Sequence, residues 1–427
     1  MKRALASQRV IKRFRVSKAD WTRKRKLTFA KVVTLIVLGH KRPQQTNLNK
    51  FYKAIGEVKQ VPTASAYCQA RHKLQGALFL YLNDLVRQGF YELWGREGQV
   101  RTWRGRRLVG VDGTYLNVPD TPETRQRYSL QPNQHGQRVQ ALGSVAYDLL
   151  NEVGLSAALD RKRAEKELLF EHHLAPTQAG DLFVLDRLYA DYAVMAFLLD
   201  KQRDFVIRFP RQTFQAVQAF WQSEQFDQIV TLQVTDKQQR FVREHGLAKT
   251  IQIRLVKVVL DTGEIEVLGT SLLDQRPYPA AEFKWVYGRR WGVETYLDRI
   301  KNVFEVERFS GHSVLSIEQD FYGVLFLATL QSVLSKEAEA ELEQHSQPNP
   351  CLYPQQVNQS VGYSAMLDYA IELLMNQRKG VDETLEALHQ LFKTNPTLRR
   401  EGRQVPRKKA SPSQKLWFYR YTKRIIA

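Results

Sequence analysis

The run of strand-like segments between residues 108 and 209 constrains the fold more than any other feature of this chain. Apolar extended segments begin at Leu108, Arg138 and Val153. Farther on, strand, helix and strand alternate up to Pro210. Consecutive strands followed by this alternation are typical of a mixed sheet with helices on its faces. We therefore predict an α/β fold built on such a sheet.

Positive charge is concentrated at the two ends of the chain. The net charge is +20, and residues 32–398 are neutral overall because residues 1–31 and 399–427 hold the excess of Lys and Arg. Basic clusters of this kind are suited to neutralising phosphates, although tails that only maintain solubility remain an alternative. The residues predicted to bind DNA in these ends are Arg23, Lys24, Arg25, Lys26, Arg407, Lys408 and Lys409.

Composition favours a protein that stays inside the cell. The longest apolar runs fall well short of the roughly 18 residues that a membrane span needs. The two cysteines, Cys68 and Cys351, do not make a disulfide framework, which favours a reducing compartment. We expect a soluble, cytoplasmic protein without a membrane partner, associated with the nucleoid when bound to DNA.

Changes in sequence texture divide the chain into five predicted regions. Apolar residues at three- and four-residue spacing predict helices in the first region, which fits a helix-turn-helix DNA-binding module or an ordinary helical bundle. The regions are a helical N-terminal domain at 1–100, the first part of an α/β core at 101–210, a β-rich insertion at 211–285, the second part of the core at 286–345, and a helical C-terminal region with a basic arm at 346–427.

The segment YGRRWGVETYLDRIK, residues 287–301, carries an unusual stripe of polar side chains. If the segment is one α-helix, Tyr287, Arg290, Glu294 and Lys301 fall within an arc of roughly 60°. A surface of this kind suits a phosphate chain held by Arg and Lys beside a metal ion held by Glu. The simpler interpretation is a helix with salt bridges between residues one turn apart.

Two further acids, Asp112 and Asp186, follow predicted strands. An acid at the carboxyl end of a strand points into the crevice where open α/β sheets place their sites. Together with Glu294 these acids would offer hard oxygen ligands to Mg²⁺ or Mn²⁺, and two such ions support phosphoryl transfer. Asp112 with Gly113 could instead form a turn, and Asp186 could cap the helix that begins near Asp191 or simply end its strand.

The spacing Tyr, two residues, Arg, three residues, Glu, six residues, Lys resembles the signature of the insertion-sequence-four group of bacterial DDE transposases. Asp112 in VDGT and Asp186 in VLDRLY resemble the first and second catalytic acids of that group. The resemblance extends from about Asp20 to about Leu334. Leu188 is a departure, because the group usually has a small residue there.

The resemblance implies an RNase H-like catalytic core in which Asp112, Asp186 and Glu294 are catalytic and hold two Mg²⁺ ions, with Mn²⁺ able to substitute. Water would cleave one strand of double-stranded DNA at the inverted-repeat ends of the transposon, and the freed 3′-OH would attack target DNA. Tyr287 and its partners on the stripe, Arg290 and Lys301, would contact the terminal phosphates. The group is expected to act as a homodimer on paired ends.

Members of the group often excise through a DNA hairpin, for which an aromatic side chain stacks a flipped base. Trp221, Trp285 and Trp291 are the candidates here. Two other functions remain open at this point. One is an RNase H-like nuclease without strand transfer, and the other is a non-catalytic or domesticated DNA-binding protein derived from a transposase.

Overall fold

The computed structural model describes most of the chain. The described residues are 1–23, 25–39, 43–133, 136–161, 165–346, 353–375 and 380–399. Four predicted DNA contacts, Lys24 and Arg407 to Lys409, lie outside them.

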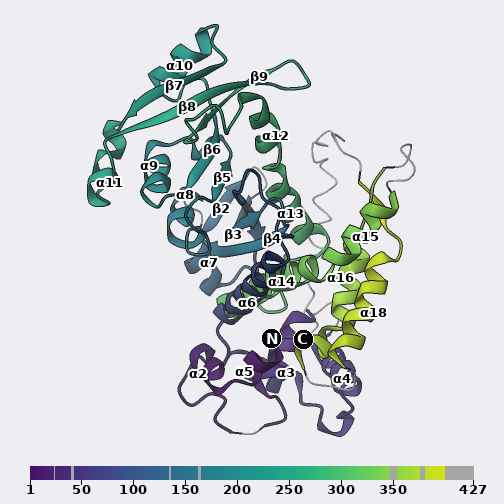
Figure 1. The fold of residues 1–427 in the computed structure, drawn as a ribbon. Helices are drawn as coiled ribbons and strands as arrows, with labels where there is room; N and C mark the ends of the chain where they lie inside the picture. Colours follow the sequence, from purple (N-terminus) through teal and green to yellow (C-terminus); the bar gives the residue numbers. More distant parts are fainter. Residues whose placement is uncertain are drawn as a thin grey trace.

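The N-terminal part is helical, as its periodicity predicts. Its α-helices are α1 (Lys2–Ala6), α2 (Gln8–Phe14), α3 (Phe29–Val37), α4 (Gln44–Ala54), α5 (Ala64–Arg71) and α6 (Ala77–Arg96). The side chain of Thr28 caps α3, and that of Thr63 caps α5 by accepting the amide of Ala66. Such caps satisfy amides that have no partner inside the helix. Figure 1 shows α2 to α5 gathered below the sheet.

Nine strands in the described residues form one mixed sheet, in the order β2-β3-β1-β5-β6-β9-β8-β7, with β4 also paired to β3. Their bounds are β1 (Leu108–Asn117), β2 (Leu130–Asn133), β3 (Gly136–Asp148), β4 (Val153–Asp160), β5 (Leu182–Leu185), β6 (Asp204–Phe209), β7 (Asp227–Gln233), β8 (Thr250–Val259) and β9 (Ile265–Thr270). β3 is antiparallel to β1 and β4, whereas β1, β5 and β6 are parallel. The arrangement β4-β3-β1-β5-β6 confirms the predicted RNase H-like core.

The sheet is buried on both faces, because alternate residues of its central strands enter different cores. In β5, Leu182 and Val184 join one apolar cluster, whereas Phe183 and Leu185 join the other. This follows from the two-residue period of a strand. α9 (Tyr192–Asp200) covers one face, and α14 (Val314–Leu334) packs on β4 from the other. The central strands therefore read as nearly continuous apolar runs.

The predicted β-rich stretch does form strands, and these strands extend the main sheet. β9 pairs with β6, β8 with β9, and β7 with β8, all antiparallel. The further helices of this part are α10 (Gln215–Gln222) and α11 (Gln239–Glu244). Strand pairing thus continues across the boundary drawn at residue 211, because β9 pairs with β6. The five proposed regions stay a prediction.

Helices make up most of the C-terminal part. They are α15 (Lys336–Ser346), α16 (Gln359–Asp368), α17 (Ala370–Leu374) and α18 (Val381–Lys393), beside a small ribbon of β10 (Gln355–Gln356) and β11 (Thr397–Leu398). Figure 1 shows α15, α16 and α18 along one side of the molecule. None of the helices in the described ranges is long and apolar enough to span a bilayer.

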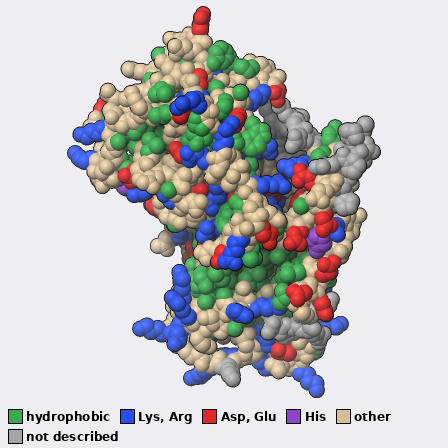
Figure 2. Space-filling view, viewed as in Figure 1, with side chains coloured by type: hydrophobic (Ala, Val, Ile, Leu, Met, Phe, Trp, Pro, Cys, Tyr) green, Lys and Arg blue, Asp and Glu red, His purple; other side chains and the backbone are tan. Residues whose placement is uncertain are grey.

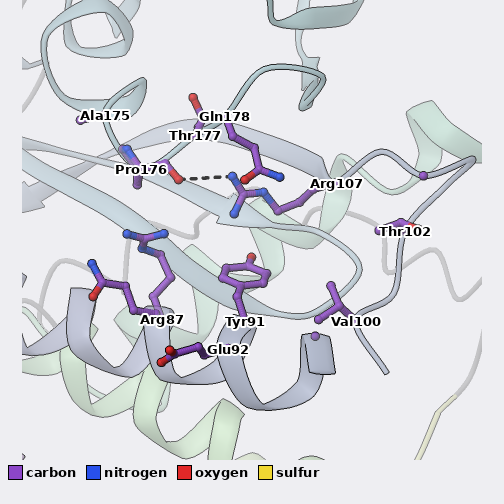
Figure 3. A pocket seen from close by; sticks show the side chains of 13 residues that line it. Arg87, Tyr91, Glu92, Val100, Thr102, Arg107, Ala175, Pro176, Thr177 and Gln178 are labelled. Atoms are coloured by element: carbon purple, nitrogen blue, oxygen red, sulfur yellow. Dashed lines mark hydrogen bonds between the residues drawn. The ribbon is translucent and has the colours of Figure 1, made fainter. Parts of the chain in front are cut away.

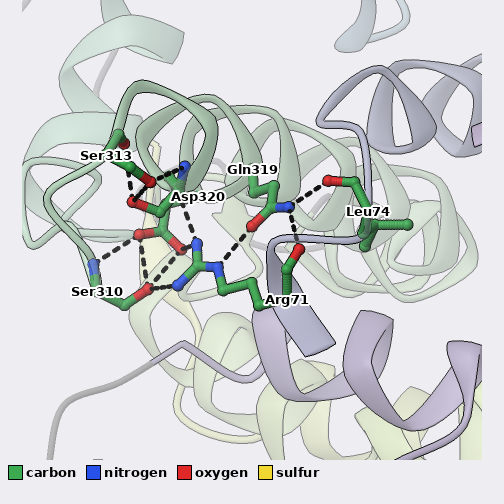
Figure 4. A network of polar contacts seen from close by, with 7 residues as sticks. Arg71, Leu74, Ser310, Ser313, Gln319 and Asp320 are labelled. Carbon is green, nitrogen blue, oxygen red and sulfur yellow. Dashed lines mark hydrogen bonds and ion pairs between the residues drawn. The ribbon is translucent and has the colours of Figure 1, made fainter. Parts of the chain in front are cut away.

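A buried polar network joins the N-terminal helices to the core (Figure 4). The guanidinium of Arg71, on α5, donates to Gln319 Oε1 at 2.5 Å and to Asp320 Oδ1 at 2.8 Å, both on α14. Asp320 Oδ2 also accepts the amide of Ser310, at 2.6 Å. Because Arg71 and Asp320 are both buried, this ion pair fixes α5 against α14.

Candidate active site

The structure brings Asp112 and Asp186 to the same level on neighbouring strands. β1 and β5 are parallel, and Gly110 lies opposite Val184. Each acid stands two residues farther along its own chain, and the backbone of Asp186 is still extended, with φ −80° and ψ 179°. Since paired strands lie about 4.8 Å apart, the two acids leave the sheet side by side, where β5 ends.

Asp112 differs in one respect from its prediction. It does not end a strand, because β1 continues to Asn117 through pairing with β3, in which Asp112 faces Val145. The parallel partner β5 is the strand that stops. This leaves the β5 side of β1 open from Asp112 onward. Asp112 Oδ1 accepts the amide of Gly113 at 2.8 Å, which holds the carboxylate at this edge.

Asp186 follows β5 directly and caps the short helix η3 (Arg187–Tyr189). Its Oδ1 accepts the amide of Leu188 at 2.7 Å. The next helix, α9, has its own cap in Asp191. The alternative role of Asp186, as the cap of that next helix, is therefore wrong, because Asp186 caps η3 instead. The contact with Leu188 leaves the second carboxylate oxygen of Asp186 unused. Leu188 is 54% exposed, so its bulk points away from the core.

The segment from Tyr287 to Lys301 is not one helix, and this prediction was wrong. α12 (Phe283–Gly288) and α13 (Trp291–Asn302) are separate, with Arg289 and Arg290 between them. The amide of Arg290 bonds to the carbonyl of Tyr287 at 3.0 Å, so the chain tightens into a turn with three-residue spacing. Gly288, a poor helix former, precedes this turn.

Glu294 lies on α13, on the face of the sheet that also carries Asp112. A Cβ added to Gly110, two residues before Asp112 on the same face of β1, would lie 3.2 Å from Val293. Glu294 follows Val293, and its Oε1 accepts from Arg290 Nη1 at 2.6 Å. The ordinary salt bridge between residues one turn apart is thus present. Arg290 is buried, and the Glu294 side chain is 27% exposed.

Tyr287 and Lys301, the remaining residues of the stripe, differ in how deeply they are buried. The hydroxyl of Tyr287 and Nε of Arg290 are buried and have no hydrogen-bond partner among the described residues. Lys301 Nζ donates to the carbonyl of Tyr115, at 2.7 Å, near the end of β1. α13 therefore crosses the open edge of β1, with Arg290 near the acids and Lys301 farther along the strand.

The charges of the three acids affect one another. Burial raises the pKa of Asp112 to about 6, and the negative charges of Glu294 and Asp186 add to this rise, whereas the Gly113 amide and Arg290 oppose it. Burial lowers the pKa of Arg290, but Tyr287 and Glu294 more than offset this, so its pKa is raised overall. Mutual repulsion of carboxylates in a partly buried place is the condition in which a divalent cation binds well.

The acids are not arranged as a finished metal cage. No three His, Cys, Asp or Glu side chains of the described residues are grouped closely enough to hold an ion as they stand. The residues nevertheless fit a divalent ion by their chemistry. Their donors are carboxylate oxygens, which Mg²⁺ and Mn²⁺ prefer, and repulsion keeps such groups apart when no cation lies between them.

A pocket of about 810 Å³ lies at the other end of β1, away from the acids (Figure 3). It lies between α6, which contributes Arg87 and Tyr91, and the loop containing Pro176. Arg107, just before β1, closes it and is paired with Asp181. Asp181 directly precedes β5, so it lies at the rim of the sheet opposite to the candidate acids. None of the candidate catalytic acids lines the pocket.

Two exposed indole rings flank the turn between α12 and α13. Trp285 is 44% exposed and Trp291 is 56% exposed. The guanidinium of Arg289 lies 4.4 Å from the ring centre of Trp285, and that of Arg290 lies 5.3 Å from Trp291. Trp221 differs, because it is half-buried on α10 under Arg211. Trp291 therefore lies beside Arg290, and Trp285 lies beside Arg289 on the preceding helix.

Basic side chains project from the lower part of the molecule in Figure 2, which the N-terminal helices form. Of the predicted DNA contacts in this part, Arg23, Arg25 and Lys26 are exposed. They lie in the segment before α3, away from the acids in sequence. These three charged side chains are therefore on the surface and take no part in the core.

Sequence reasoning missed one acid at the site, Glu165, the first residue of α8 (Glu165–Leu168). A Cβ on Gly113 would lie 2.8 Å from Glu165 Cδ, so the carboxyl group occupies the space that this glycine leaves open. Glu165 stands in a charged segment that offers several acids, including Glu167 and Glu171. The glycine after Asp112 was the available signal that another group approaches β1 closely.

The chain resembles known proteins over most of its length. Residues 103–330 match the family described as the transposase DDE domain, which is more than half of the chain. Over 320 residues the chain is 24% identical to the transposase InsG for insertion sequence element IS4 of Escherichia coli (strain K12), covering 72% of this chain and 70% of that protein. A solved structure of the piggyBac transposase synaptic complex with hairpin DNA superposes with a TM-score of 0.45 and 10% identity, over 97% of this chain and 88% of that one. The domain match ends close to the predicted limit at Leu334, although it begins at residue 103 and not near Asp20. The chain belongs to the DDE transposase family of enzymes that cleave DNA and transfer its strands.

Proposed function

We propose that this enzyme is a cut-and-paste transposase that binds the ends of its own insertion sequence, cleaves them with Mg²⁺, and joins the 3′-OH ends to target DNA. The main support is the level placement of Asp112 and Asp186 on parallel neighbours, with Glu294 on the helix that crosses the same edge. These three acids are the proposed catalytic residues and metal ligands.

Each acid has an oxygen available for a further contact. Asp112 and Asp186 each use one oxygen for a backbone amide, and neither has an ion-pair partner among the described residues. Glu294 gives one oxygen to Arg290. Two divalent ions held by these oxygens would activate the attacking water or 3′-OH and stabilise the charge on the leaving oxygen.

Arg290 and Tyr287 are proposed to contact the terminal phosphates. Within the described part of the chain, each has a buried polar atom without an acceptor, at Arg290 Nε and the Tyr287 hydroxyl. A buried donor of this kind costs free energy, which an incoming phosphate oxygen would recover. Lys301 would add a cation one step along the strand after releasing the carbonyl of Tyr115.

Exposed Trp285 and Trp291 are the proposed stacking residues if excision proceeds through a hairpin. Stacking of a base on an aromatic ring contributes about 1–3 kcal/mol. Trp221 is a weaker candidate because its ring is half-buried. We further propose that two copies act together, since a cut-and-paste reaction must join both ends of one element.

The proposal is tested on transposon-end DNA with single substitutions of the three acids. Asp112→Ala, Asp186→Ala and Glu294→Ala should each lower the Mg²⁺-dependent cleavage rate by at least about 10³-fold, while the affinity for end DNA changes little. A matched control is Asp120→Ala, because Asp120 is exposed and paired only with nearby Arg125 among the described residues. The control should cleave like the unaltered protein. Undiminished cutting in any one of the three variants would contradict the assignment of that acid.

Strand transfer requires its own measurement. Ends already cut to carry a 3′-OH are supplied with target DNA, and joined products are quantified with and without Mg²⁺. Joining that depends on Mg²⁺ and on Asp112 is the expected outcome. Cleavage without any joining would instead favour a nuclease of the same fold.

A further inference from the structure

Glu165 reaches the edge of the sheet from the face opposite to Glu294. It begins α8, which follows β4, and its carboxyl group lies over Gly113 of β1. Gly113 follows Asp112, so its missing side chain would project to the other face of the strand. Ideal Cβ placement there gives 2.9 Å to Glu165 Oε1 and 3.1 Å to Oε2. Only a glycine at this position lets the carboxyl group approach the strand so closely.

Among the described residues, this carboxyl group has few partners. Its one hydrogen bond from a described side chain is a long contact of 3.4 Å from the hydroxyl of buried Tyr189. It has no ion-pair partner within the described ranges. The next residue, Lys166, is turned toward Asp191 and pairs with it. A half-buried acid with one weak hydrogen bond is unfavourable unless something else binds it.

Its charged neighbours are the proposed metal ligands. Burial raises the pKa of Glu165 to about 7, and the negative charges of Asp112 and Asp186 add to the rise. Asp112, Asp186 and Glu165 thus lie near one edge of the sheet, without forming a finished cage, and Glu294 approaches from the other face. Four carboxylates carry four negative charges, which is the charge that two divalent ions balance.

We infer that Glu165 supplies a fourth carboxylate to this site, as an oxygen ligand for a divalent ion held with Asp112 and Asp186. This inference rests on the proposed function, which places the metal ions at these acids. The competing explanation is that Glu165 only anchors Tyr189. The length of that hydrogen bond makes an anchoring role weak.

The test measures metal binding directly, without DNA, on the full-length protein. Mn²⁺ is titrated by calorimetry at pH 8 into the unaltered protein and into Glu165→Gln. We expect the affinity to fall by about 10-fold or more, the loss expected when a carboxylate is removed from a metal site or its surroundings. The matched control is Glu167→Gln, which makes the same change at an exposed position of the same helix and should bind Mn²⁺ normally.

Two further variants keep the result decisive if Glu165→Gln folds poorly. Gly113→Ala retains every acid but places a methyl group 2.8 Å from Glu165 Cδ, so it should push the flexible side chain aside and weaken Mn²⁺ binding in the same direction. Tyr189→Phe removes the hydrogen bond to Glu165 and should leave Mn²⁺ affinity within about 2-fold. A loss of affinity in Tyr189→Phe equal to that in Glu165→Gln would overturn the inference.

Asp112→Asn separates the two levels of the proposal. If Asp112→Asn loses Mn²⁺ binding while Glu165→Gln and Gly113→Ala retain it, the inference about Glu165 is wrong and the metal site stands. If neither Asp112→Asn nor Glu165→Gln changes Mn²⁺ binding, the metal site itself is elsewhere and the proposed function fails with it.

Discussion

Asp112 and Gly113 are adjacent in the chain, but they contribute to the site in different ways. The Asp112 carboxylate bonds to the amide of Gly113, and the absent side chain of Gly113 makes room for Glu165. A larger residue after the acid would leave β1 intact but crowd the carboxyl group of Glu165. Asp112 supplies one negative charge, and Gly113 leaves the space in which Glu165 brings a second one close to it.

That concentration predicts that Asp112 lowers stability in metal-free buffer. Its pKa in the folded protein, about 6, lies above the ordinary value of 3.8. Between these values the folded protein binds more protons than the unfolded chain, so stability falls as pH rises through this window. Asp112→Asn should therefore raise the Tm at pH 7.5 by on the order of 2 °C.

Thermal melts in the presence of a chelator check this expectation. The gain should disappear near pH 4, where the carboxyl group is protonated in the folded protein and about half protonated in the unfolded chain. Asp236→Asn, at an exposed position outside the site, should show no gain at either pH. A lower Tm for Asp112→Asn at pH 7.5 would mean that the carboxylate stabilises the metal-free fold, which is the opposite of what its raised pKa predicts.

At the scale of elements, α13 and α14 connect the site to the rest of the molecule. α13 crosses the edge that holds the acids, and α14, reached through the turn at Ser310, packs on α6 and β4. Arg71 on α5 bonds to Asp320 on α14, which in turn accepts the amide of Ser310. The N-terminal helices are thus attached to the segment that follows α13.

This attachment predicts a large effect of a single substitution far from the acids. Arg71→Met should lower the free energy of unfolding by about 3–5 kcal/mol, because it leaves Asp320 buried without its cation. Urea unfolding monitored by tryptophan fluorescence measures this loss. Arg125→Met provides the control, since the Arg125–Asp120 pair is exposed to solvent and its loss should change the free energy of unfolding little.

The double variant Arg71→Met with Asp320→Leu identifies the cause. Removing both charges should recover part of the stability that Arg71→Met loses, because no charge is then left unpaired in the interior. A double variant as unstable as the sum of the two single variants would show that the two residues act independently.

At the scale of the whole molecule, the distribution of charge predicts how DNA binding responds to salt. Residues 399–427 carry ten Lys or Arg and one acid. Deleting them should weaken DNA binding and reduce the slope of log K against log salt by about 0.9 for every phosphate that this arm neutralises. Fluorescence anisotropy with labelled end DNA at several salt concentrations measures this slope.

A comparison at the other end of the chain sharpens the result. Replacing Arg23, Arg25 and Lys26 together by Ala should also reduce the slope, because these exposed side chains are predicted phosphate contacts. An unchanged slope after deletion of residues 399–427, with a reduced slope for the triple variant, would leave the C-terminal arm with a role in solubility only.

The sequence by itself determined the kinds of element, their order and three of the candidate acids, Asp112, Asp186 and Glu294. Apolar runs predict strands because their side chains face buried layers, and the alternation after residue 180 predicts the parallel part of the sheet. The spacing of Tyr287, Arg290, Glu294 and Lys301 was enough to suggest the family. All of these signals are local along the chain.

Only the tertiary structure decided which groups meet. Parallel pairing of β1 with β5 sets Asp112 level with Asp186, and such register depends on contacts between residues far apart in sequence. The break before Arg290 and the approach of Glu165 to Gly113 also depend on packing between separate elements. A one-dimensional pattern records which residues are available, whereas the distance between them is set by how the sheet and its helices close on one another.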